Sequence, residues 1–158
     1  MHNLLLVLLL LLPAPQSRDA KLQKEFRQYR REAISVIEQH AEAHPECVLK
    51  RVIPTLKRAT IVFAYNDDQP RVQVMRSWSF RDQKTGALVI VINSRLEWNL
   101  KDAMVTLAHE SLHLTGDPPI CGSDVREPDG NPTCNLFGRD LFTSEDISNA
   151  IRQHLYKD

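Results

Sequence analysis

Two histidines and a glutamate lie close together in the segment His109-Glu110-Ser111-Leu112-His113. On a helix, side chains four positions apart project from the same face, one turn from each other. Two neutral imidazoles placed in this way can bind one zinc ion at about 2.0–2.1 Å. The carboxylate of Glu110 can then take a proton from a zinc-bound water as the water attacks a carbonyl carbon. The spacing therefore predicts a zinc site with Glu110 as general base.

The residues around this segment have the periodicity of a helix that runs from about residue 99 or 101 to Thr115. Apolar residues recur there at three- and four-residue steps, among them Leu100, Met104, Leu107, Ala108 and Leu112. Gly116 is well placed to end the helix, because glycine adopts the backbone conformation common just past a helix C-terminus. The pattern thus places both histidines on one helical element.

The stretch 105–116, Val-Thr-Leu-Ala-His-Glu-Ser-Leu-His-Leu-Thr-Gly, resembles the active-site helix of the zincin metallopeptidases. It includes the glycine that metzincins carry three residues after the second histidine. The resemblance implies hydrolysis of peptide bonds in a peptide or protein substrate, with zinc held by His109 and His113. Metzincins place a third histidine, or in some branches an aspartate, three residues after the glycine. That position is Pro119 here, which cannot bind a metal.

The third zinc ligand must therefore come from another residue, and three candidates stay open. Asp124 follows Cys121-Gly-Ser and is loosely similar to the Gly-Thr-x-Asp segment of aspzincins. Asp117 is nearest in sequence, but it can reach the metal only if Gly116 breaks the helix. Glu145, at the start of the last predicted helix, resembles the gluzincin arrangement. We favour Asp124, then Asp117, then Glu145.

Two other functions are compatible with the same segment. It also resembles the His-Gly-x-Leu-His-Leu-x-Gly stretch of the bacterial ribosomal-RNA maturation endoribonuclease, with Glu110 in place of the glycine. The chain has 20 Lys and Arg against 20 Asp and Glu, whereas nucleic-acid binders usually carry a basic excess. We therefore expect no nucleic acid as partner. The second alternative is a non-catalytic secreted module that keeps a zincin shape for binding.

The amino terminus has the composition of a secretory signal. Leu4–Leu12 is an unbroken run of nine Leu and Val residues, whereas a membrane-spanning helix needs about 20 apolar residues. We expect residues 1–17 to be a signal peptide, with Ser17 as its last residue. The prediction is a secreted or periplasmic protein that has no stable membrane span once the leader is removed.

The cysteines point to the same kind of compartment. In an exported protein two of the three would normally pair. Cys121 and Cys134 bracket a polar loop rich in Pro, Gly, Asp and Asn, so we predict a disulfide between them. Such a bridge stabilises the fold by about 3 kcal/mol. Cys47 is left over, and no two cysteines have the close spacing of a zinc–thiolate site. The histidines outside the motif are expected at the surface or at helix ends: His40, His44 and His154.

Residues 18–158 are predicted to form a single zincin-like α+β domain, monomeric and built around one core. Helical periodicity covers residues 19–43, and residues 47–58 are compatible with either a short helix or a strand. Strand-like runs follow over 60–65 and 71–80.

The second half of the domain completes the predicted order of elements. Residues 87–92 form the most apolar strand and are expected to be covered on both faces. Lys84-Thr85-Gly86 is a hairpin signal before that strand. After the zinc helix, a loop is expected up to about Phe142, and Thr143 begins the cap of a final helix. The expected architecture is thus an N-terminal helix, a three-stranded sheet, the active-site helix, a loop and a C-terminal helix.

Overall fold

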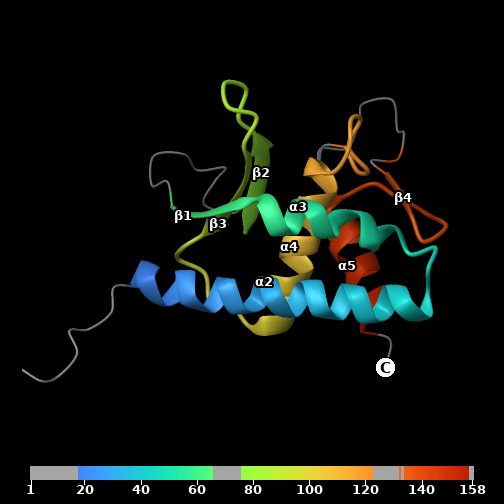
Figure 1. Ribbon diagram of the computed structural model, residues 1–158, viewed down its shortest axis with the longest axis horizontal. Coiled ribbons are helices and arrows are strands. Elements are labelled where there is room, and N and C mark those ends of the chain that lie inside the picture. Colours follow the sequence, from blue (N-terminus) through green and yellow to red (C-terminus); the bar gives the residue numbers. More distant parts are fainter. Residues whose placement is uncertain (1–17, 66–75, 123–131, 133, 157–158) are drawn as a thin grey trace, which may run out of the picture.

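The computed structural model describes residues 18–65, 76–122, 132 and 134–156. It confirms an α+β architecture in which helices pack around a small sheet (Figure 1). The predicted signal peptide and Asp124 lie outside the described residues, as do residues 71–75 of the second predicted strand. The elements in chain order are α2 (Arg18–Ala43), η1 (Val48–Val52), α3 (Ile53–Arg58), β1 (Thr60–Ala64), β2 (Ser77–Arg81), β3 (Leu88–Asn93), α4 (Leu100–Leu114), β4 (Cys134–Leu136), β5 (Arg139–Leu141) and α5 (Ser144–Leu155).

The three predicted strands form one sheet with β3 in its centre. β1 pairs parallel to β3, and β2 pairs antiparallel to it. The predicted hairpin between β2 and β3 is confirmed, since Gly86 has φ +71° and the Asp82 carboxylate accepts the backbone N–H groups of Lys84 and Thr85. Every residue of β3 except the half-buried Val89 is buried. This confirms that the most apolar strand is the one covered on both faces.

Helix α2 runs along one side of the molecule and passes α4 and α5 (Figure 1). Its inward residues follow helical steps of three and four, and they are Leu22, Phe26, Ala33, Ile37 and Ala41. The ambiguous segment after α2 is helical, with the 3-10 turn η1 leading into α3. Pro54 lies in the first turn of α3, where a missing backbone N–H costs no hydrogen bond.

Helix α4 is central, because its residues are buried on most of its circumference. Asn99 caps its N-terminus by accepting the backbone N–H of Asp102 at 2.8 Å. The helix ends at Leu114, and Gly116 follows with φ +88°. A Cβ atom at Gly116 would lie 2.9 Å from the Pro118 carbonyl oxygen, so the position requires glycine. The predicted end of this helix is thereby confirmed.

The prediction of a continuous loop to Phe142 is wrong. Strands β4 and β5 form a short antiparallel hairpin within it. Its turn consists of Phe137 at φ +54° and Gly138 at φ +72°. Two positive φ values are typical of a type I′ turn, for which Asn-Gly is the usual sequence signal. Phenylalanine is a rare first residue in such a turn, so residues 137–138 carry no hairpin signal.

The C-terminal part is held by a disulfide and a capped helix. Cys121 and Cys134 are bonded, as predicted. The side chain of Thr143 and that of Asp146 form a reciprocal capping box at the start of α5. The buried face of α5 is formed by Ile147, Ala150 and Ile151. The disulfide thus joins the segment that follows α4 to the first residue of β4.

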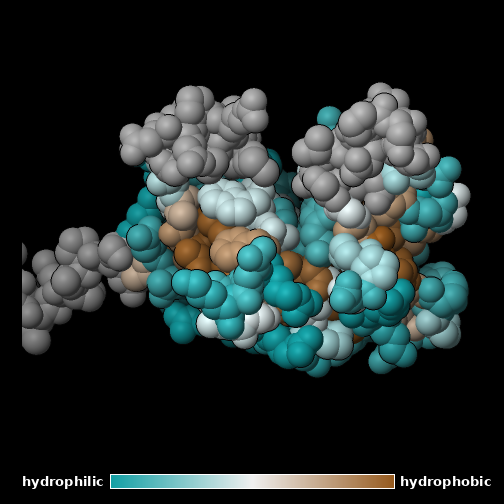
Figure 2. Space-filling model, turned by 90° about the horizontal axis from the view of Figure 1, so that it is seen from above, coloured by the Kyte–Doolittle hydropathy of each residue, from teal (hydrophilic) through white to brown (hydrophobic). Residues whose placement is uncertain are grey.

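The visible surface is mostly hydrophilic, with hydrophobic residues in smaller areas between the polar ones (Figure 2). Large hydrophobic side chains among the described residues are exposed at Val62, Phe80 and Leu100, each on a different element. Single exposed hydrophobic residues are ordinary on protein surfaces. None of the helices that the structure describes has the length and apolar character needed to cross a membrane.

Candidate metal centres

The His-Glu-x-x-His segment lies in the second half of α4, surrounded by β2, α5 and the loop after α4. His109 and Glu110 are each 3% exposed, and His113 is half-buried. The two imidazole rings lie on the same side of the helix with centroids 4.9 Å apart. The structure therefore confirms that both histidines share one face, one turn from each other.

Each of these histidines has a hydrogen-bond partner at its Nδ1 atom. His109 Nδ1 lies 2.9 Å from the Ser148 hydroxyl, and His113 Nδ1 lies 3.2 Å from the Cys121 carbonyl oxygen. Because a carbonyl oxygen only accepts, His113 must donate from Nδ1, which puts the lone pair of the neutral ring on Nε2. Metal-binding histidines are commonly oriented by such a bond from the other ring nitrogen. His113 thus has the supporting contact that Nε2 coordination requires, and the Ser148 hydroxyl can accept the equivalent bond from His109.

The carboxylate between the histidines is held by the sheet. The Ser77 hydroxyl donates to Glu110 Oε1 at 2.6 Å, and the Ser79 hydroxyl donates to the Glu110 backbone carbonyl at 3.2 Å. Both serines belong to β2, so one strand fixes this turn of α4 at two points. Local sequence patterns do not indicate these serines, because they lie more than thirty residues away from Glu110 in the chain.

Neither of the two described candidates for a third metal ligand, Asp117 and Glu145, forms a three-donor group with His109 and His113. Asp117 is exposed, although Gly116 does break the helix as that candidate requires. Glu145 is exposed in the first turn of α5, and Asp146 rather than Glu145 forms the capping box. Within the described ranges, no further His, Cys, Asp or Glu joins His109 and His113 in a three-donor group. His109 and His113 thus supply two nitrogen donors of the kind that zinc binds. Asp124 lies outside the described residues.

A second group of donors is brought together at the other end of the helices. His40 lies in the last turn of α2, Cys47 directly precedes η1, and His154 lies in the last turn of α5. His154 Nε2 is 2.8 Å from His40 Nε2 and 3.1 Å from Cys47 Sγ. One ligand atom from each residue lies within 4.8 Å of the other two, so this group could hold a metal ion. We call it the His40–Cys47–His154 cluster.

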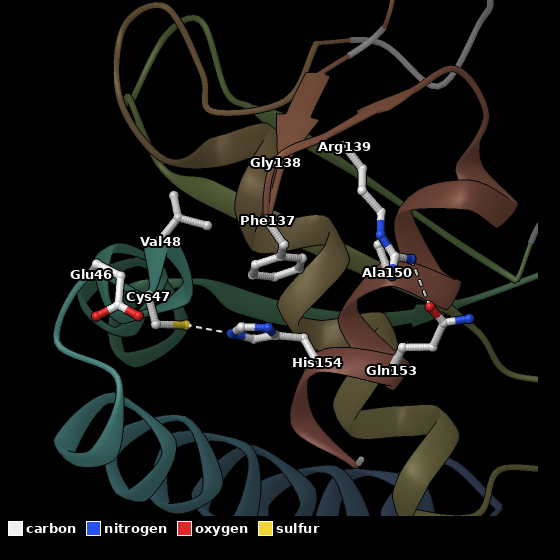
Figure 3. A pocket seen from close by; sticks show the side chains of 9 residues that line it. All are labelled: Glu46, Cys47, Val48, Phe137, Gly138, Arg139, Ala150, Gln153 and His154. Atoms are coloured by element: carbon white, nitrogen blue, oxygen red, sulfur yellow. Dashed lines mark hydrogen bonds between the residues drawn. The ribbon is translucent and has the colours of Figure 1, made fainter.

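The cluster borders a pocket of about 540 Å³ between η1, the β4–β5 turn and α5 (Figure 3). The Phe137 ring stacks on His154 with centroids 3.7 Å apart and planes 13° apart. A non-glycine residue at positive φ costs about 1–2 kcal/mol, which the packing around Phe137 must offset. Burial raises the pKa of the Cys47 thiol and outweighs the opposing hydrogen bonds from the backbone of Leu49 and Lys50.

The sequence prediction placed the cluster histidines at the surface or at helix ends and found no cysteine suited to a thiolate site. The two histidines do lie in last helical turns, but both are half-buried and face each other. A usable signal was present in the periodicity. His40 follows the buried Ile37 by three positions, and His154 follows the buried Ile151 by three. Besides these two histidines, Cys47, the cysteine outside the disulfide, was a further indication of the cluster.

No protein-family model, curated protein or solved structure matches this chain. The relationship to zincins accordingly remains a prediction from residues 105–116.

Proposed function

We propose that this chain is a secreted zinc-dependent peptidase in which His109 and His113 hold the metal and Glu110 is the general base. The observation that carries the proposal is the orientation of His113, whose Nδ1 atom donates to the Cys121 carbonyl. A surface histidine has no need of a buried backbone acceptor, whereas a ligand histidine uses one to direct Nε2 at the metal.

Each residue of the proposed site has a separate role. A bound zinc ion lowers the pKa of a coordinated water and polarises a carbonyl group. Glu110 is next to His109, and its carboxylate would serve as the base for a water bound at this site. Ser77 donates to Oε1 of this carboxylate and so holds its orientation. Asp124 stays our first candidate for the third ligand, because Asp117 and Glu145 are exposed and form no three-donor group with the histidine pair in the described structure.

Strand β2 is suited to hold an extended substrate. It pairs with β3 on one side, and in the sheet that the structure describes no strand pairs with its other side. An extended peptide can add to such an edge through main-chain hydrogen bonds. Because β2 also carries Ser77, a peptide bound along this edge would lie near Glu110.

Export is part of the proposal and rests on two features. The Leu-rich residues 4–12 match the apolar core of a signal peptide. The Cys121–Cys134 disulfide is of a kind that persists in oxidising compartments.

The test is metal analysis of the purified protein combined with a peptide-library cleavage assay, with and without a chelator. Glu110→Gln keeps the side-chain size and an oxygen that can accept from Ser77, so zinc should stay bound. Cleavage should fall at least about a hundredfold, the usual contribution of a general base. Glu38→Gln, an exposed change on α2, is the matched control and should cleave like the wild type. Cleavage by Glu110→Gln at the wild-type rate would refute the mechanism.

The second candidate function is a non-catalytic binding module. It is favoured by the missing third donor among the described residues. The two functions differ in His113→Gln, which should abolish chelator-sensitive cleavage in a peptidase. A module would show no cleavage in either the wild type or this variant.

A further inference from the structure

The geometry points to a second metal site in this protein, formed by His40, Cys47 and His154 and suited to a thiophilic divalent cation of the zinc type. This site is separate from the His109–His113 pair and independent of the proposed peptidase activity.

The donor set fits such an ion. A thiolate and two imidazoles are ligands that zinc binds tetrahedrally, whereas magnesium and calcium require oxygen ligands. Zn–N bonds of about 2.05 Å and a Zn–S bond of about 2.3 Å place tetrahedral ligand atoms about 3.4 Å (N to N) and about 3.6 Å (N to S) apart. The corresponding distances to His154 Nε2 are 2.8 Å from His40 Nε2 and 3.1 Å from Cys47 Sγ. Each of these two distances would have to increase by only about half an ångström, and the third pair of ligand atoms lies within 4.8 Å.

The contacts favour a shared cation over a catalytic cysteine–histidine pair. In such a pair the third group binds the opposite ring nitrogen and orients the base. Here His40 and Cys47 both approach the same atom, Nε2 of His154. The three ligand atoms lie within 4.8 Å of one another, as the ligands of a single metal ion do.

Two helix ends add a favourable field. His40 lies in the last turn of α2, and His154 lies in the last turn of α5. The last turn of a helix carries partial negative charge from carbonyl groups that have no helical partner. Both C-termini meet at the cluster, so their combined field attracts a cation.

The side chains are held in place before any ion binds. Cys47 is buried, and its backbone N–H donates to the His44 carbonyl at 2.9 Å. The Phe137 ring covers one face of the His154 imidazole (Figure 3). The adjoining pocket gives an ion and a water access from one side. A water that enters through this pocket can supply the fourth ligand.

Cobalt(II) titration of chelator-treated wild-type protein with its disulfide intact tests the site. Cobalt replaces zinc in tetrahedral sites, and a thiolate ligand gives a near-ultraviolet sulfur-to-cobalt charge-transfer band. Cys121 and Cys134 are bonded to each other, so Cys47 is the thiol among the described residues that can produce the band. We expect the band to appear within two equivalents of cobalt, one for each proposed site, and added zinc to remove it. A wild-type titration without the band would overturn the proposal, and it requires no variant to fold.

Variants then assign the ligands. Cys47→Ser should abolish the band, and His40→Gln or His154→Gln should weaken cobalt binding at least tenfold. His113→Gln is the matched control, since it removes a ligand of the other site and should leave the band unchanged. A band that disappears in His113→Gln and survives in His154→Gln would contradict the assignment.

Metal binding here should also stabilise the fold, because the cluster joins residues 114 positions apart on the first and last helices described. At zinc concentrations about a hundred times Kd, the Tm of His113→Gln, in which the other proposed site lacks a ligand, should rise by roughly 10 °C. This rise should be lost when Cys47→Ser is added to His113→Gln. An equal rise in the double variant would show that the stabilising ion lies elsewhere.

Discussion

Ser77 donates a hydrogen bond of 2.6 Å to the Glu110 carboxylate and so joins the edge strand β2 to the central helix α4. The contact links two elements that the sequence predicts separately. It also makes the proposed general base dependent on a residue of the sheet. Ser79 bonds the backbone carbonyl of the same glutamate and offers a natural comparison.

Ser77→Ala should lower kcat for peptide cleavage about tenfold with little change in KM. A hydrogen bond to a charged group contributes about 1.5 kcal/mol, which corresponds to that factor. Ser79→Ala is the matched control, since it leaves the carboxylate partner in place and should change kcat less than twofold. Equal losses in both variants would mean that β2 packing, rather than the carboxylate contact, matters for the rate.

Ser148→Ala should weaken zinc binding at the motif, because Ser148 is the partner of His109 Nδ1. Contacts of this kind typically change metal affinity by about 10–100-fold. The measurement is competition with a chromophoric chelator in a Cys47→Ser background, which removes the second proposed site. Asn149→Ala, an exposed neighbour on α5, is the control. Unchanged affinity in Ser148→Ala would argue against His109 as a ligand.

The Asp102 carboxylate should make the unfolding free energy depend on pH in the acidic range. Burial raises the pKa of Asp102, but hydrogen bonds from Arg152 and Asn99, together with the nearby Arg76 charge, outweigh it and leave the pKa below its ordinary value. The unfolded state therefore binds the proton more readily than the folded state. The stabilisation is complete above the unfolded pKa of about 3.9 and is lost as the pH falls through the lower folded pKa.

Arg152→Met removes the 2.9 Å ion pair with Asp102. The variant should therefore lose less unfolding free energy than the wild type as the pH falls. In urea unfolding at a series of pH values, the wild type should exceed the variant in stability near neutral pH. The difference should shrink as the pH falls below about 4. A difference that stays constant with pH would mean that Arg152 stabilises the fold through packing alone.

Two of the glycines at positive φ, Gly86 and Gly116, distinguish the cost of backbone strain from the cost of steric crowding. Gly86→Ala meets no atom within 4 Å and should cost about 1 kcal/mol from its φ of +71° alone. Gly116→Ala has the same kind of strain, and its Cβ would also lie 2.9 Å from the Pro118 carbonyl oxygen. Its loss of unfolding free energy should exceed that of Gly86→Ala by roughly 1–2 kcal/mol. Equal losses of unfolding free energy in the two variants would show that the backbone after α4 moves aside at little cost.

Replacing both cysteines of the disulfide with alanine should lower the unfolding free energy by about 3 kcal/mol, the value expected for a short closed loop. The gap from the wild type should close when both proteins are measured under reducing conditions. Because the Cys121 carbonyl accepts from His113, the double variant should also bind zinc more weakly at the motif. A gap that persists in reductant would point to lost packing of the buried sulfurs.

The sequence alone determined the features that depend on neighbours in the chain. The helical step from His109 to His113, the apolar strand β3 and the glycine that ends α4 all follow from local periodicity and backbone preference. The pairing of Cys121 with Cys134 was also predictable, because a single polar loop separates them.

Only the tertiary structure decided what those elements touch. Ser77 and Ser148 reach the motif from a strand and a helix that local patterns cannot place in space. The His40–Cys47–His154 cluster joins residues 107 and 114 positions apart, and such contacts arise when helices pack and not from any spacing along the chain. The Phe137 turn was missed for a related reason, since packing against His154 holds a residue that local preference would reject.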